Sequence, residues 1–61
     1  MKLRITIDMA NDAFRRWPQV EVARILREYA RHVEVVRMPD RGDPDKLMDI
    51  NGNTVGEAKV R

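Results

Sequence analysis

Residues 2–8 read Lys-Leu-Arg-Ile-Thr-Ile-Asp, and polar and apolar side chains alternate strictly along them. Successive side chains of an extended strand point to opposite faces, so this pattern predicts a strand with one buried face and one solvent-facing face. Leu3, Ile5 and Ile7 form the expected buried face. One strand is not stable alone, because it needs hydrogen-bonded neighbours and an apolar layer over its buried face. The rest of the chain must supply both.

Residues 18–33 have the period of a helix. Pro18 suits the first helical position, where its missing N–H costs nothing. The apolar side chains that recur at helical spacing form one stripe: Val22, Ile25, Leu26, Tyr29, Ala30 and Val33. The stripe predicts an amphipathic helix of about four turns that lies on the sheet. No glycine ends this helix, and the β-branched residues in 34–38 favour a short strand there over a frayed last turn.

The C-terminal third predicts a loop followed by a hairpin. Residues 39–45 contain two prolines, a glycine and three aspartates, which is typical of a loop. Asn51-Gly52 between two apolar runs is a strong hairpin signal. A type I′ turn there would pair Met48 with Val55.

A second hairpin geometry is equally compatible with these residues. A type I turn that starts at Asp49 and ends in a glycine bulge, with Gly52 in the left-handed region, would pair Leu47 with Val55 instead. The two registers place different side chains on the buried face. The sequence does not choose between them.

These elements predict a single domain, residues 1–61, of the α+β class. Its order is β-α-(β)-β-β, with one amphipathic helix packed on a small antiparallel sheet. The expected core comprises Leu3, Ile5, Ile7, Val22, Ile25, Leu26, Tyr29 and Val33, with two or three hairpin residues. Such a core is thin for a monomer. The chain has no cysteine, so no disulfide can stabilise it further. The surplus apolar residues Val20, Val35 and Val36 therefore predict a homodimer.

Basic side chains on the helix are candidates for a binding surface. Arg24, Arg27 and Arg31 fall on its solvent face, and Arg37 and Arg41 follow it; we call these five residues the arginine ridge. A row of arginines can contact an acidic protein surface or the phosphates of a nucleic acid. The net charge is only +2, and glutamates at helical spacing also fit an ordinary solvated face.

The residue inventory argues against an enzyme. The chain has no cysteine and no serine, a single histidine, and three glycines too far apart for a phosphate loop. Asp49, Asn51 and Asn53 have the spacing that begins a calcium loop, but Thr54 and Val60 stand where such a loop has glycine and glutamate. We therefore expect no metal, no cofactor and no catalytic residue.

Two further absences bear on location. No apolar run approaches the roughly 20 residues of a membrane span, and the N-terminus lacks the apolar core of a signal peptide. We therefore expect a cytoplasmic protein that does not contact a membrane.

Three segments together resemble short proteins encoded by bacteriophages and prophages. They are Asp-Met-Ala-Asn-Asp-Ala-Phe at 8–14, Glu-Val-Ala-Arg-Ile-Leu-Arg-Glu at 21–28, and Asp-Ile-Asn-Gly-Asn-Thr-Val-Gly at 49–56. The resemblance implies an accessory protein in the cytoplasm of a bacterial host that binds a host or phage protein. An inhibitor of a defence system such as CRISPR-Cas is the most specific form of this hypothesis.

Two alternatives stay open beside it. One is a small nucleic-acid-binding regulator that uses the arginine ridge. The other is a structural or assembly protein whose hairpin edge pairs with another chain.

Overall fold

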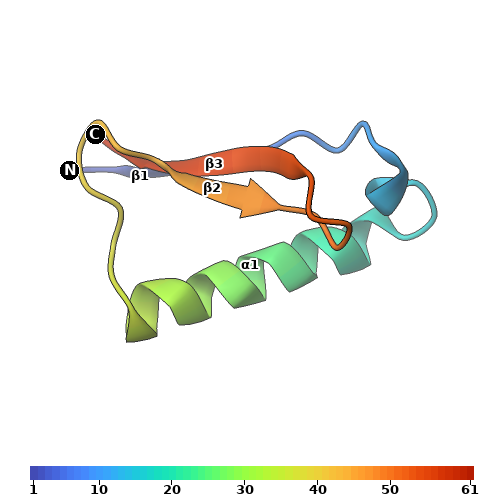
Figure 1. Cartoon of the computed structure of the whole chain (residues 1–61), viewed down its shortest axis with the longest axis horizontal. Helices are drawn as coiled ribbons and strands as arrows, with labels where there is room; N and C mark the ends of the chain where they lie inside the picture. The colour runs from blue at the N-terminus through green and yellow to red at the C-terminus, as the bar shows by residue number, and fades with distance from the viewer.

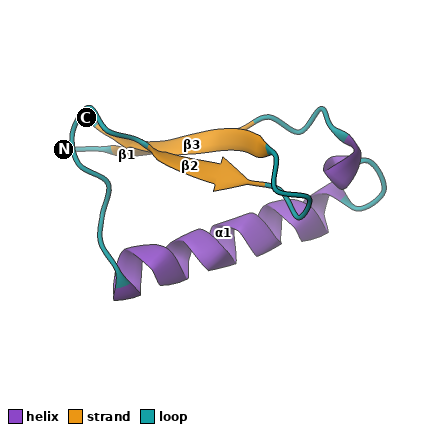
Figure 2. Ribbon diagram, in the orientation of Figure 1, coloured by secondary structure: helices purple, strands orange, loops and turns teal.

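The protein is a two-layer α+β domain in which one helix covers one sheet. A computed structural model describes all residues, 1–61, in the order β1 (Leu3–Ile7), the 3-10 helix η1 (Asp12–Phe14), α1 (Pro18–Val35), β2 (Asp45–Met48) and β3 (Thr54–Val60). The strands form one antiparallel sheet in the order β1-β3-β2, and α1 lies along one face of it (Figures 1 and 2). The predicted fold class is confirmed.

The pairing of β1 with β3 brings the two ends of the chain together. Ile5 lies opposite Ala58, and the ladder extends beyond both strands to Lys2 and Arg61. The main chains of these last two residues exchange hydrogen bonds of 2.8 and 2.9 Å. Ala58 is fully buried under α1, so odd-numbered residues of β1 share the helix-facing side and even-numbered residues point outward.

The expected strand at 34–38 is wrong. α1 begins at Pro18 as predicted but continues to Val35. The N–H groups of Val36 and Arg37 then both donate to the carbonyl of His32, at 2.8 and 3.2 Å, and close the last turn. The β-branched residues here have no strand beside them to pair with, so the hydrogen bonds of the continuing helix prevail.

The hairpin between β2 and β3 starts with the second of the two turns that the sequence left open, the type I turn with a glycine bulge. The N–H of Gly52 donates to the carbonyl of Asp49 at 3.1 Å, and Gly52 is left-handed with φ of 83°. Asn51 has no positive φ, which excludes the type I′ turn.

Both predicted pairings beyond that turn are wrong. Met48 pairs with Thr54 and Leu47 pairs with Gly56, so Val55 is a bulged residue between them. A bulge adds one residue to one strand and turns its side chain. Here it brings Val55 into the buried core.

The core lies between α1, β2 and β3 rather than under the whole sheet. It contains Phe14, Ile25, Tyr29, Leu47, Val55 and Ala58, with Val60 also buried. Three predicted core residues are instead partly open to solvent: Leu3, Ile5 and Leu26 are 42%, 37% and 41% exposed. The reason is that α1 packs against η1 and β2, which leaves the β1 edge of the sheet uncovered.

Candidate functional site

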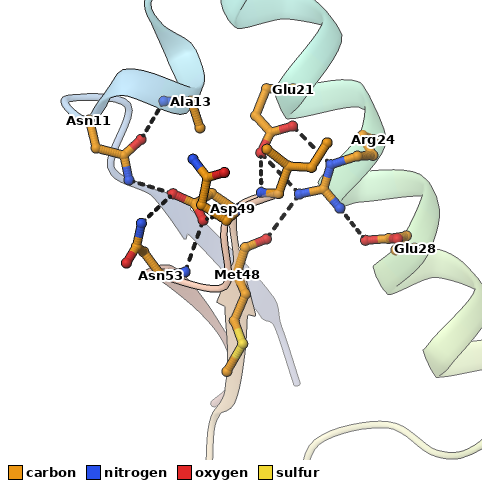
Figure 3. Close-up of polar contacts among 10 residues, drawn as sticks. Asn11, Ala13, Glu21, Arg24, Glu28, Met48, Asp49 and Asn53 are labelled. Carbon is orange, nitrogen blue, oxygen red and sulfur yellow. Dashed lines mark hydrogen bonds and ion pairs between the residues drawn. The ribbon is translucent and has the colours of Figure 1, made fainter.

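Asp49 is a buried carboxylate that organises the hairpin turn. Its Oδ1 accepts hydrogen bonds from the main-chain N–H groups of Asn51 and Asn53, both at 2.9 Å. Its Oδ2 accepts from the side-chain amides of Asn11, at 2.7 Å, and Asn53, at 3.2 Å (Figure 3). Asn11 in turn accepts from the N–H of Ala13 and caps η1. Asp49 therefore fastens the segment before α1 to the hairpin, which the calcium-loop spacing in the sequence does not reveal.

Glu21 is a second buried carboxylate, beside the first. It accepts two hydrogen bonds from Arg24, at 2.8 and 3.0 Å, and one from the N–H of Ile50, at 2.8 Å (Figure 3). The guanidinium of Arg24 also contacts Glu28 and donates to the carbonyl of Met48 at 3.2 Å. This network fastens the first half of α1 to the hairpin turn.

Both buried carboxylates are held in their charged form. Burial raises the pKa of Asp49, but the hydrogen bonds from Asn53, Asn11 and Asn51 outweigh it, and the pKa lies below the ordinary 3.8. The hydrogen bonds of Arg24 lower the pKa of Glu21 below 4.5 against the opposing effect of burial. Each carboxylate thus has internal donors for its charge. Their role is to hold the fold together, and neither is free to bind a ligand.

A hollow of about 320 Å³ lies between α1 and β2. The Tyr29 hydroxyl donates to Asp45 at 3.1 Å, and Arg37 donates to the same carboxylate at 3.2 Å. The ring of His32 stacks on that of Tyr29. Burial and the Asp45 hydrogen bond raise the pKa of Tyr29 to about 12, so its phenol stays a donor and is not a base at neutral pH. The cluster joins the end of α1 to the start of β2.

The structure divides the predicted arginine ridge. Arg24 is largely covered and bonded to Glu21, so it is not available to a partner. Arg37 is tied to Asp45. Arg27, Arg31 and Arg41 are exposed, and no ion pair or side-chain hydrogen bond involves them. What remains on α1 is a pair of arginines.

A denser group of cations lies on the outer face of the sheet, which α1 does not cover. The register of β1 and β3 places Arg4 directly opposite Lys59. In the next pair of residues toward the chain ends, the main-chain hydrogen bonds place Lys2 beside Arg61. We call Lys2, Arg4, Lys59 and Arg61 the basic patch. None of the ion pairs in the structure includes any of them.

The neighbours of the basic patch do little to neutralise it. Glu57 is the acidic residue in the adjoining row, and it lies opposite Lys46 on its other side. Like charges directly opposite each other on a sheet are destabilising, so an anion that bridges them would relieve the repulsion. Sequence reasoning placed Lys2 and Arg4 on the solvent side of the first strand. It missed the patch because the register that adds residues 59 and 61 is not local.

The structure has neither a metal-binding cluster nor a membrane-spanning helix. No group of three or more histidine, aspartate or glutamate side chains is arranged to hold a metal ion. No helix combines the length and the apolar character that crossing a membrane requires.

Comparison with known proteins adds no relative. No protein-family model, no curated protein and no solved structure matches this chain. The resemblance to phage-encoded proteins stays a prediction.

Proposed function

We propose that this chain is a non-enzymatic protein that binds the phosphate backbone of a nucleic acid through the basic patch. The observation that carries the proposal is the placement of Arg4 opposite Lys59, next to Lys2 and Arg61, with no ion pair to any of them. Contacts to phosphates come mainly from lysine and arginine, and they need no apolar surface around them.

The composition of the patch favours a nucleic acid over a protein partner. The centre of a protein interface is depleted of charge and enriched in aromatic residues. The outer face of the sheet has no aromatic side chain, because the three aromatics, Phe14, Trp17 and Tyr29, all lie in η1, in α1 or between them.

The same absence bears on the kind of nucleic acid. Aromatic side chains are what proteins stack on the bases of single strands. A patch without them supports contact with the backbone of a duplex that does not depend on the base sequence. Duplex binding is compatible with the phage-encoded inhibitor that the resemblance suggests. The resemblance alone supports that more specific role.

A pair of charge-reversal variants tests the location of the site. Arg4→Glu with Lys59→Glu removes two cations of the patch, and Arg27→Glu with Arg31→Glu makes the same change in net charge on α1. At about 100 mM salt we expect the first variant to bind a generic 20-bp duplex on the order of 50-fold more weakly, because it loses two phosphate contacts. The second should change affinity by no more than about threefold.

Fluorescence anisotropy of a labelled duplex measures both affinities, and circular dichroism checks that both variants fold. An equal or larger loss in the α1 variant would place the site on the arginine ridge and contradict the proposal. If the wild-type protein does not bind the duplex but captures a protein from nuclease-treated bacterial lysate, the partner is a protein and the proposal is wrong.

A further inference from the structure

The outer edge of β1 carries main-chain groups that no other strand uses. β1 is an edge strand whose only neighbour is β3. The main chains of Lys2 and Asp8, at either end of β1, bond to Arg61 and Val55, so the main-chain groups of even-numbered residues point toward β3. In an antiparallel ladder the intervening residues point their N–H and C=O groups the other way. Leu3, Ile5 and Ile7 therefore present their main-chain groups to solvent, as a template for one more strand.

Apolar surface lies next to this free edge. The side chains of Leu3 and Ile5 point to the helix side of the sheet, yet they are 42% and 37% exposed because α1 lies over β2 instead. Leu26 on α1 is 41% exposed as well. An open edge with half-exposed aliphatic residues along it fits a partner that supplies both a strand and an apolar layer.

We propose that this partner is a second copy of the chain, paired β1 to β1 in antiparallel orientation about a two-fold axis at Ile5. Ile5 then lies opposite its own copy, and Leu3 lies opposite the partner's Ile7. Lys2 lies opposite the partner's Asp8, so each end of the interface gains a pair of opposite charges. Leu3, Ile5 and Ile7 of each copy exchange main-chain hydrogen bonds with the same residues of the partner, about six bonds in all.

Charge and strand length together select this register over its neighbours. A two-fold axis at Arg4 would place that arginine opposite its own copy, which is unfavourable. An axis at Thr6 would place Arg4 opposite the partner's Asp8, but it would also pair Leu3 with Met9, which lies beyond Ile7, the last residue of β1. The axis at Ile5 alone pairs the full length of both strands.

The dimer is a continuous six-stranded sheet with both helices on one face. Leu26 and the β1 aliphatic residues of each copy then lie between the two helices. Both basic patches lie on the opposite face, where Lys2 of each copy pairs with the partner's Asp8 and the other three cations of each patch stay unpaired. The interface is made mainly by the main chain of the β1 edge and by apolar side chains on the helix side of the sheet, so its formation does not require the proposed function.

Single cysteines test the register directly, because the natural chain has none. In Ile5→Cys the two Cα atoms would be about 5.5 Å apart, within the range that a disulfide spans. In Leu3→Cys, on the same face and similarly exposed, the offset along the strands would separate them by about 14 Å. Under mild oxidation we expect Ile5→Cys to form a covalent dimer at least about tenfold faster than Leu3→Cys.

Sedimentation velocity of the wild-type protein at about 100 µM provides the second measurement, and a dimer is expected. Equal cross-linking rates, or no covalent dimer of folded Ile5→Cys, would overturn the proposed register. A wild-type protein that sediments as a monomer would overturn the dimer itself. Neither measurement contains a nucleic acid, so their outcome is separate from that of the duplex-binding experiment.

Discussion

Replacing Gly56 with alanine is expected to lower the free energy of unfolding by about 3 kcal/mol or more. Gly56 lies in the central strand β3, between Ile7 of β1 and Leu47 of β2. A methyl group at this position would lie 1.9 Å from the carbonyl oxygen of Thr6 and 3.0 Å from its carbonyl carbon. The obstacle is main chain, so β1 would have to move away from β3 to admit it.

The cost is a large part of the stability of a domain of this size. Overpacking costs typically 1–3 kcal/mol and more where main chain must move, so we expect about 3 kcal/mol or more here. A chain of 61 residues has a total stability of about 3–9 kcal/mol. The Tm of the variant, measured by circular dichroism, should therefore fall by about 12–24 °C or more.

Gly42→Ala is the matched control for Gly56→Ala. Gly42 is left-handed, with φ of 78°, but a methyl group there has no atom within 4 Å. We expect it to cost about 1–2 kcal/mol from backbone conformation alone. A Gly56→Ala protein as stable as the control would mean that β1 and β3 are not packed as described.

Replacing Glu21 with glutamine should cause the second-largest loss of stability. The carboxylate accepts from Arg24 and from the N–H of Ile50. Glutamine has the same shape, but its NH₂ group would face donors and leave at least one of them unpaired. An unpaired buried donor costs about 1–3 kcal/mol, which corresponds to a fall in Tm of about 10 °C for a domain of this size. Glu34→Gln, an exposed site on the same helix, should change stability by less than about 0.5 kcal/mol.

The pH dependence of stability gives an independent reading of Glu21. Its pKa is lowered by folding, so its contribution is complete above the unfolded value of 4.5 and disappears as the pH falls through the lower folded value. Asp49 behaves in the same way below 3.8. Wild-type Tm should therefore fall steeply below about pH 4.5, and Glu21→Gln should lose less between pH 6 and pH 3. Parallel Tm curves for the two proteins would show that Glu21 is not the paired carboxylate described.

Local periodicity was enough to predict the elements that depend on neighbours in the sequence. The alternation at 2–8 predicts β1, and Pro18 with the apolar stripe predicts where α1 begins. The Asn51-Gly52 hairpin signal predicts the left-handed conformation of Gly52 in the same way. Each pattern is determined within a few residues, so the sequence alone carries it.

Features that depend on distant partners were not predictable. The segment 34–38 has strand propensity but no strand to pair with. Leu3 and Ile5 have the alternation of buried residues, yet their exposure is decided by where α1 rests on the sheet. Such placements are properties of the packed molecule.

The candidate site shows the same division. The helical pattern places Arg24 on the solvent face. In the structure it binds Glu21 and the carbonyl of Met48 in the hairpin, 24 residues away. The basic patch joins residues at opposite ends of the chain, and only the register of β1 with β3 reveals it.

The salt dependence of duplex binding tests the central claim most directly. The affinity of the wild-type protein for a generic duplex should be measured between 50 and 200 mM salt. If the four cations of the basic patch each neutralise one phosphate, the logarithm of affinity falls against the logarithm of salt with a slope of about −3.6 per chain. Binding that is undetectable at 50 mM salt, or a slope shallower than about −1, would contradict the account.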